Sequence, residues 1–312
     1  MEIRGSTIVI TGASSGNGKA LALKLAQEGA NLVLAARRED LLQELAFECE
    51  LHGVRALAVK TDITKDEELR HLYTQALLFS PTIDVWFNNA GVLAMGEFSK
   101  TPWELCYQTL MTNLMGSMHA AHLIIPHFIK NGKGTLIHMN SLSAFIPTPH
   151  VVAYSASKMG LKGLSEALRY ELTPYKDIHV CDVFATFLDS TGMDHAANFT
   201  GHKLAPPPPV LDPCDVADAI IKLIQNPKPS ITLGVNSYLG RFARGVAPET
   251  LGKIMDKLTR FALKKSPKEP VTEGAVLEPT EKGAGIHGGW KGIGIFRRLK
   301  DSKAVETQNQ LH

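Results

Sequence analysis

Several features are scarce in this sequence, and each scarcity excludes a class of protein. Among 312 residues there are four cysteines, at positions 49, 106, 181 and 214, and no two lie at a close pair spacing. Neither a zinc site nor a disulfide framework is expected, and free thiols in a reducing cytosol are the simpler account. An excess of one charge is also lacking, because 33 basic residues against 31 acidic ones leave a net charge of +2. This balance predicts no nucleic-acid-binding surface.

Long apolar runs are missing as well. No stretch of the sequence reaches the roughly 18–20 apolar residues that a membrane-spanning helix needs. The N-terminus carries Glu2 and Arg4 before a short strand and lacks the apolar region of a secretory signal. We therefore expect a cytoplasmic location. What is present, 44% apolar residues over 312 positions, suffices for one large α/β domain and a tail.

The first motif is a strand, a glycine-rich turn and the start of a helix. Residues 7–11 form a β-branched run, residues 12–18 read GASSGNG, and an amphipathic helix is predicted over 19–28. Glycines let the backbone approach a pyrophosphate, and a helix N-terminus offers free N–H groups and a positive dipole. The pattern indicates an anion site. A plain strand-to-helix turn is the alternative, because a glycine pattern alone is weak evidence.

The residues after the second predicted strand, 31–36, bear on cofactor choice. An NAD-dependent enzyme places an acidic residue there to hold the adenosine ribose 2′-hydroxyl, whereas this chain has Ala36, Arg37 and Arg38. Guanidinium groups suit a 2′-phosphate, so the pattern favours NADP over NAD. Two solvated arginines are the alternative.

Two further strand ends carry candidate ligand-binding residues. After a predicted strand over 56–60, Asp62 either receives an adenine amino group or caps the helix expected to start near Lys65. A fourth strand, 83–87, ends in Asn-Asn-Ala-Gly, where small residues permit close backbone approach to a ligand. Its first member, Asn88, either braces the sheet or touches the cofactor.

The segment 134–169 carries the chemistry that the rest of the chain serves. It predicts a buried strand over 134–139, then Ser141, then a helix with Tyr154 and Lys158. Side chains at i and i+4 share a helix face, so the ammonium can lower the phenol pKa from its usual value of about 10. The pair then acts as a general acid or base, with Ser141 available to a substrate oxygen. A surface helix is the alternative, because this spacing is common by chance.

The remaining elements complete an alternating pattern. A long helix is predicted over 101–130 with Asn113 in its middle, where an amide either holds a water or a carbonyl or simply faces solvent. A strand over 178–184, a helix over 215–225 and a last strand over 231–235 follow. This βαβ alternation predicts a Rossmann-type, doubly wound parallel sheet with helices on both faces.

In register, these motifs resemble the short-chain dehydrogenase/reductase family over roughly residues 3–235. The motifs are TGASSGNG, NNAG and YSASK, and the catalytic tetrad of the family maps onto Asn113, Ser141, Tyr154 and Lys158. The resemblance implies that Tyr154 exchanges a proton with the substrate oxygen and that Ser141 orients this oxygen. It further implies that Lys158 binds the nicotinamide ribose and that Asn113 holds a helix carbonyl and a relay water. Hydride then passes between the nicotinamide and the substrate carbon.

The resemblance also implies a set of NADP(H) contacts, while the cysteine spacing leads us to expect no metal site. The expected cofactor-binding residues are Gly12, Ser14, Ser15, Gly16, Asn17, Gly18, Arg37, Arg38, Asp62, Asn89, Ala90, Gly91, Tyr154, Lys158, Leu188 and Ser190. The chain departs from the family at Asn17, usually aliphatic, and at Ser15, often basic in NADP-dependent members. It also lacks the usual Pro-Gly after the sixth strand, where 184–190 reads FATFLDS.

The substrate side is expected to be apolar. Residues 187–212 form a long connection with four prolines at 206–209, and such loops often act as lids. A lipophilic alcohol or ketone is our hypothesis for the substrate, although apolar lining is the default for any pocket. The residues expected to line it are Phe145, Ile146, Val151, Val152, Phe187 and Met193.

The C-terminal part reads differently from the body. Residues 241–265 hold seven Lys or Arg against two acids, a net of +5, with apolar residues at helical spacing. This helix either packs beside the substrate loop or lies on an anionic membrane surface. We expect a catalytic domain over 1–235, a helical extension over 236–265 and a mostly disordered tail over 266–312, with 288–290 and 293–299 as candidate docking segments.

Three functions from different classes fit the sequence. The first is an NADP-dependent alcohol dehydrogenase or carbonyl reductase. The second is a cofactor-binding protein that has lost catalysis, which the complete tetrad argues against. The third is a peripheral membrane or scaffold protein that works through the basic segment 241–265 and the tail. By resemblance, a homodimer or homotetramer is expected to form through helices 101–130 and 150–173.

Overall fold

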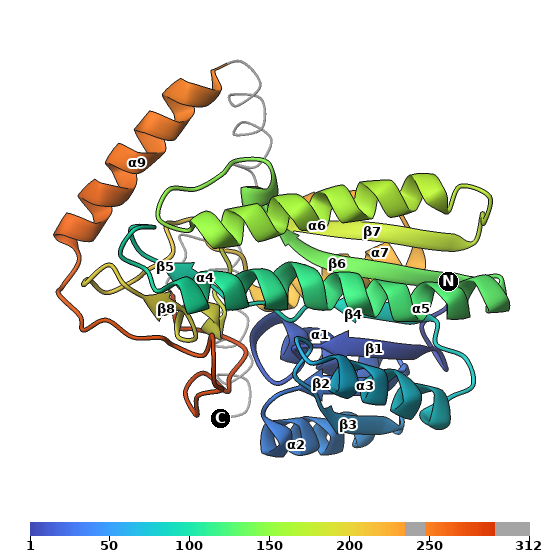
Figure 1. Cartoon of the computed structure of the whole chain (residues 1–312). Helices are drawn as coiled ribbons and strands as arrows, with labels where there is room; N and C mark the ends of the chain where they lie inside the picture. Colours follow the sequence, from blue (N-terminus) through green and yellow to red (C-terminus); the bar gives the residue numbers. More distant parts are fainter. Residues whose placement is uncertain (235–246, 291–312) are drawn as a thin grey trace, which may run out of the picture.

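The computed structural model describes residues 1–234 and 247–290, and a seven-stranded parallel sheet forms its centre (Figure 1). The strand order β3-β2-β1-β4-β6-β7-β9 places β1 and β4 side by side, where the winding reverses. The strands are β1 (Thr7–Thr11), β2 (Asn31–Ala36), β3 (Ala56–Lys60), β4 (Val85–Asn88), β6 (Gly134–Ser141), β7 (Ile178–Ala185) and β9 (Ser230–Leu233). The predicted Rossmann-type sheet is therefore confirmed.

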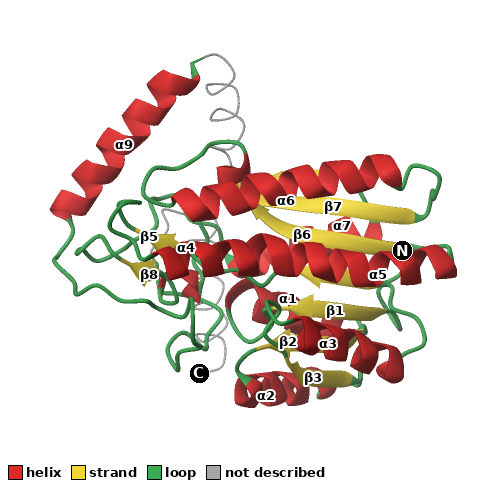
Figure 2. Ribbon diagram, in the orientation of Figure 1, coloured by secondary structure: helices red, strands yellow, loops and turns green. Residues whose placement is uncertain are grey.

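Helices cover both faces of the sheet (Figure 2). One face packs against α1 (Gly16–Gln27), α2 (Glu39–Glu50) and α7 (Pro213–Gln225). The other packs against α3 (Asp66–Phe79), α5 (Ser117–Asn131) and α6 (Val152–Glu171). Alternation along each strand produces the two cores: Ile8 and Ile10 enter the first, and Val9 between them enters the second.

The predicted helix over 101–130 is interrupted in its middle. It consists of α4 (Trp103–Leu110), a π-helical segment (Met111–Gly116) and α5, which is followed by Gly132 in a left-handed conformation. Such wide turns are rare and are frequently found at functional sites. Asn113 lies inside this segment, so the helix is irregular where a candidate catalytic side chain leaves it.

Several element boundaries differ from the sequence predictions. Helix α1 begins at Gly16 rather than near residue 19, so the last glycines of the turn already belong to the helix. Strand β6 continues to Ser141, two residues beyond the predicted end. A second sheet was not predicted: β5 (Ala94–Met95) pairs with β8 (Ala197–Asn198). Val235, the predicted end of the last strand, lies outside the described residues.

Helix α9 (Pro248–Lys265) stands away from the body at the upper left of Figure 1. None of its residues is buried. It touches the rest of the protein through Asp256, whose carboxylate lies 3.3 Å from His150 Nε2, and through Arg260, 3.6 Å from Glu97. Within the described ranges, no helix has both the length and the apolar character needed to cross a lipid bilayer.

Residues 266–290 pack on the body, which differs from the expected mostly disordered tail. Thr272 pairs with Asn198 in an antiparallel bridge, and Ala275 and Val276 are buried. The amino-acid composition suggested disorder. Composition does not reveal the backbone hydrogen bonds to distant residues that hold this segment in place. Residues 293–299, the other candidate docking segment, lie outside the described residues, and the boundaries of the three expected regions stay predictions.

Candidate active site

Three members of the expected tetrad meet where β6 ends and α6 begins. Ser141 is the last residue of β6, and Tyr154 and Lys158 lie on the first two turns of α6. The Ser141 hydroxyl is hydrogen-bonded to the Tyr154 phenol. Lys158 is buried, with its ammonium 5.7 Å from the centroid of the Tyr154 ring. The geometry brings a candidate proton donor and a candidate oxygen-orienting hydroxyl into direct contact.

The pKa values of this pair differ from the sequence expectation. Burial raises the pKa of the Tyr154 phenol, and the hydrogen bond from Ser141 opposes this in part. Burial lowers the pKa of the Lys158 ammonium to about 8, with Asp182 acting in the opposite direction. The expected lowering of the Tyr154 pKa by Lys158 is not seen, because burial of the phenol is the dominant influence. The Lys158 ammonium donates to the Met139 carbonyl oxygen, 2.8 Å away.

Asn113 fastens the loop after β4 to the start of α6. Its amide oxygen accepts from the Val92 N–H at 2.8 Å, and its amide nitrogen donates to the Val92 carbonyl at 3.0 Å and to Ser157 Oγ at 3.1 Å. A Cβ atom added at Gly91 would lie 3.4 Å from Asn113 Oδ1 and 3.8 Å from Lys158 Nζ. All four tetrad side chains therefore lie together, and Asn113 is buried rather than solvent-facing.

A buried polar network lies under the site and was missed by sequence reasoning. The Asp182 carboxylate is fully buried in β7 and accepts hydrogen bonds from Asn140 at 3.2 Å, Ser165 at 3.0 Å and Arg169 at 3.0 Å. The sequence did contain one signal of this network, which is an aspartate inside the largely apolar run IHVCDVF. Since Asp182 raises the pKa of Lys158, this network influences the charge in the site.

The glycine turn is packed too tightly for side chains. Gly12 has φ +65°, and a Cβ there would lie 2.7 Å from Ala90 Cα. A Cβ at Gly18 would lie 2.3 Å from the Gly12 carbonyl oxygen. The Asn89 amide donates to the carbonyls of Thr11 and Gly12 at 3.1 and 3.0 Å. The turn and the Asn-Asn-Ala-Gly loop thus form one unit at the carboxyl edge of the sheet.

The structure distinguishes between the two roles considered for Asn88, bracing the sheet and touching the cofactor. Its amide donates to the Ser117 carbonyl at 3.2 Å and accepts from Trp86 Nε1 at 3.0 Å. Asn88 therefore braces the sheet against α5.

Asp62 does not cap α3. Its carboxylate accepts hydrogen bonds from Thr64, and α3 begins later, at Asp66.

Two buried polar atoms at the turn fit a cradle for a dinucleotide. The Asn17 amide donates to Asn89 at 3.1 Å, but its Oδ1 has no hydrogen-bond partner among the described residues. The Thr191 hydroxyl is also buried and has no partner there. Thr191 follows Leu188 and Ser190, the residues expected at the nicotinamide, and sequence reasoning missed it because the usual Pro-Gly landmark is absent. Its free hydroxyl makes it a further candidate for cofactor contact.

Arg38 lies beside the glycine turn, and neither Arg37 nor Arg38 is fully solvated. Arg38 donates to Ser14 Oγ at 3.2 Å and to the Lys282 carbonyl at 3.0 Å, and Arg37 donates to the Leu277 carbonyl at 2.9 Å. Burial lowers the pKa of the Arg37 guanidinium, while Asp62 raises it. Both cations thus meet the C-terminal segment, which the sequence did not anticipate.

The residues expected to line a substrate pocket do not form one continuous apolar wall. Ile146 and Val151 are buried, whereas Val152 and Phe187 are 46% and 45% exposed. The Phe145 ring packs on Phe184, with centroids 4.5 Å apart. The substrate side therefore stays a proposal.

Comparison with known proteins decides the family, because the family model described as short chain dehydrogenase matches residues 6–200. The chain belongs to the short-chain dehydrogenase family. A ketoacyl reductase of Nostoc sp., HetN, is 30% identical over 234 residues, 75% of this chain and 80% of that one. The uncharacterized oxidoreductase YxnA of Bacillus subtilis is 28% identical over 290 residues, 92% of this chain and 81% of that one.

Solved structures share the fold of this dehydrogenase. A short chain dehydrogenase from Burkholderia cenocepacia in complex with NADP has a TM-score of 0.69 and 22% identity, covering 82% of this chain and 99% of that one. Membership in this family and the ketoacyl reductase relative show an NAD(P)-dependent oxidoreductase that acts on CH–OH donors.

Proposed function

We propose that this dehydrogenase transfers hydride between NADP(H) and a lipophilic alcohol or ketone. The observation that carries the proposal is the contact between Ser141 and Tyr154 beside the buried Lys158, at the strand edge where the glycine turn lies. A phenol already hydrogen-bonded to a second hydroxyl can share a substrate oxygen with it.

In this proposal each tetrad residue has one task. When bound, the nicotinamide cofactor supplies or accepts the hydride. Tyr154 donates its proton to the carbonyl oxygen during reduction and recovers it during oxidation, while Ser141 stabilises the charge that develops there. Lys158, whose ammonium is buried beside Tyr154, binds the cofactor ribose. Asn113 holds the Val92 backbone and so fixes the floor of the site.

The preference for NADP over NAD rests on Arg37 and Arg38. Two guanidinium groups lie beside Ser14, and the end of β2 offers Ala36 where an acid would select NAD. The NADP in the Burkholderia structure is consistent with this choice. Asp62 stays a candidate for the adenine amino group.

Titration with NADPH and NADH, followed by nicotinamide fluorescence, tests the cofactor proposal. Arg37→Asp should raise the NADPH dissociation constant at least tenfold more than the NADH constant, because a bidentate phosphate contact is lost. Arg55→Asp, an exposed change of equal charge, is the control and should leave the ratio of the two constants unchanged. A ratio unaffected by Arg37→Asp would contradict the preference.

The lipophilic substrate is supported by the buried Ile146 and Val151 and by the ketoacyl reductase relative. A series of ketones of increasing chain length tests it. We expect kcat/KM to rise with each added methylene, by up to about 0.8 kcal/mol of transition-state binding. A flat series would refute a lipophilic pocket.

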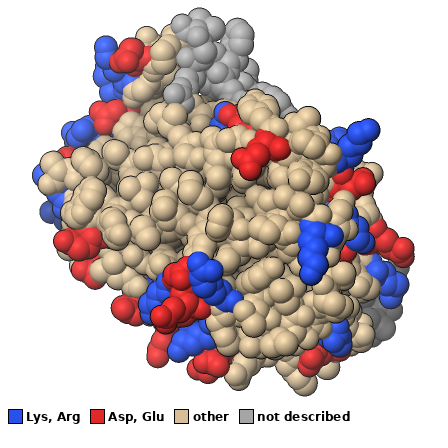
Figure 3. Space-filling model, turned by 45° about the vertical axis from the view of Figure 1, so that its right-hand side comes forward, with Lys and Arg blue, Asp and Glu red and all other residues tan. Residues whose placement is uncertain are grey.

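Self-association through α4, α5 and α6 is also proposed. Figure 3 shows a broad face of uncharged atoms with the charged side chains mostly around its rim. Large apolar side chains are exposed on these three helices and on the π-helical segment: Trp103, Tyr107, Met115, Met118, Ile129, Val152, Met159 and Tyr170. Sedimentation velocity should give a dimer or tetramer, and Tyr107→Glu should shift it toward the monomer.

Helix α9 supports a second, peripheral role at an anionic membrane surface. Its exposed apolar stripe consists of Ile254, Leu258 and Phe261, which are 49%, 62% and 57% exposed. Lys253, Lys257 and Lys264 follow one side of this stripe by helical spacing. Co-sedimentation with anionic vesicles should fall with Leu258→Gln, and binding unchanged by that substitution would remove the membrane role.

A further inference from the structure

The C-terminal residues 275–290, called here the strap, lie along the expected dinucleotide site. After α9 the chain returns to the edge of the sheet where the strands end, as the red segment of Figure 1 shows. At its start, the buried Val276 packs in a small apolar cluster with Ala94, Leu105 and Ala197. From there the strap follows the site from its adenosine end to its nicotinamide end.

At the adenosine end, strap carbonyls bind the two arginines expected to hold the 2′-phosphate. Arg37 donates to the carbonyls of Leu277 at 2.9 Å and of Ala275. Arg38 donates to the carbonyls of Lys282 at 3.0 Å and Thr280 at 3.3 Å. Carbonyl oxygens are the acceptors that phosphate oxygens would replace.

At the glycine turn, the strap and a bound cofactor would compete for a single hydrogen-bond donor. The Gly16 N–H, at the start of α1, donates to the Gly285 carbonyl at 2.9 Å. An arginine has several donors and can serve two acceptors, but a backbone N–H has one hydrogen. The helix N-terminus that is suited to a pyrophosphate is therefore already used.

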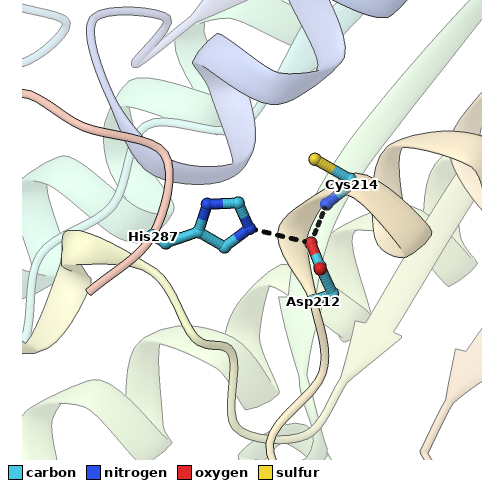
Figure 4. A group of neighbouring side chains, drawn as sticks. All are labelled: Asp212, Cys214 and His287. Carbon is cyan, nitrogen blue, oxygen red and sulfur yellow. Dashed lines mark hydrogen bonds and ion pairs between the residues drawn. The ribbon is translucent and has the colours of Figure 1, made fainter. Parts of the chain in front are cut away.

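At the nicotinamide end, the strap is anchored beside the loop after β7. The Gly288 N–H donates to the Asp189 carbonyl at 3.2 Å, and the Trp290 N–H donates to the Asp189 carboxylate at 2.7 Å. His287 Nε2 lies 3.1 Å from the Asp212 carboxylate, which also accepts from the Cys214 N–H at the start of α7 (Figure 4).

Glycines let the strap sit this close. A Cβ atom at Gly288 would lie 2.5 Å from the Ser190 carbonyl oxygen, and one at Gly283 would lie 2.5 Å from His195 Nε2. A Cβ at Gly285 would meet nothing nearer than the His287 carbonyl oxygen at 3.7 Å. The close packing of the strap therefore depends on Gly283 and Gly288 and not on Gly285.

We propose that the strap is an autoinhibitory segment that occupies the cofactor site and must leave before NADP(H) binds. The inference rests on the proposed cofactor site. If the strap is closed most of the time, the apparent affinity for cofactor is reduced by the fraction of open molecules. Loosening the strap should then tighten the binding of NADPH and NADH by the same factor, because both need the same Gly16 donor.

The test uses the full chain and two substitutions of the same kind. Gly288→Ala should unseat the strap and lower both dissociation constants about fivefold or more, which corresponds to a closed state favoured by at least about fourfold. Gly285→Ala keeps the carbonyl, adds a methyl in ordinary van der Waals contact with the His287 carbonyl oxygen and should change neither constant. Circular dichroism melts verify that both variants fold.

Tryptic cleavage after Lys282 gives an independent measurement. Cofactor should increase cleavage there, since Lys282 leaves Arg38 when the strap opens, while cleavage after Lys222, within α7, should not rise. Cofactor that protects Lys282, or binding unchanged by Gly288→Ala, overturns the strap and leaves the proposed function standing. Absence of NADPH and NADH binding in both variants and the natural chain overturns both proposals.

Discussion

The ammonium of Lys158 donates a hydrogen bond to the carbonyl oxygen of Met139, two residues before Ser141 on the same strand. Helix α6 is thereby tied to β6 at the point where both contribute to the site. Because Tyr154 lies one helical turn before Lys158, this bond also fixes the distance between the phenol and the serine hydroxyl. The candidate chemistry is thus positioned by a helix and a strand rather than by loops.

Tyr154→Phe should lower kcat by about 10²–10⁴-fold, because the proton donor is lost while the ring is kept. NADPH binding should change little. Tyr170→Phe removes the same hydroxyl from the exposed end of α6 and serves as the control. Steady-state kinetics with a ketone substrate measure the effect, and equal activity of the two variants would exclude Tyr154 as the acid.

Ser141→Ala should reduce kcat by roughly 10²–10³-fold, the range for loss of one donor to a developing oxyanion. It also removes the hydrogen bond that lowers the Tyr154 pKa, so that pKa should rise further. Ser143→Ala, two residues along the chain, is the matched change. A kcat loss as large in Ser143→Ala would point to the turn rather than to the hydroxyl.

The pH dependence should reveal the coupling between Lys158 and Asp182. Lys158 must carry its charge to act, so activity should fall as pH rises through its pKa of about 8. Asp182 raises that pKa, so Asp182→Asn should move the alkaline limb to lower pH. Asp177→Asn is the control. If the alkaline limb does not move, Asp182 does not influence the pKa of Lys158.

Glycine substitutions should separate close packing from helix propensity. At Gly18 an alanine methyl would lie 2.3 Å from a backbone carbonyl oxygen, so Gly18→Ala should destabilise the fold and abolish cofactor binding. At Gly163 on α6 nothing lies within 4 Å, so Gly163→Ala should stabilise by about 0.5–1 kcal/mol. Thermal unfolding compares them, and similar melting temperatures would refute the packing argument.

The sheet and the tetrad were predictable because their signals are local in sequence. Alternation at Ile8, Val9 and Ile10 determines which face each side chain enters, and the i, i+4 spacing of Tyr154 and Lys158 determines their common direction. The identity of the tetrad came from resemblance to a family with those motifs. Its catalytic roles stay predictions.

What escaped prediction depends on partners distant in sequence. Arg37 meets Leu277, which lies 240 positions away, and no local pattern announces such a contact. The raised pKa of Tyr154 likewise follows from burial, which spacing along a helix does not report. Thr191 was missed because its loop lacks the landmark by which it would have been aligned.

The π-helical segment around Asn113 has a consequence for insertions and deletions. A π-helical turn holds about one residue more than an α-helical turn, so removal of one residue from Met111–Gly116 would convert the wide turn into a regular one. The side chains within the segment would then leave the helix in different directions. Asn113 could no longer meet both Val92 and Ser157. The count of residues in this segment is therefore as constrained as the identity of the asparagine.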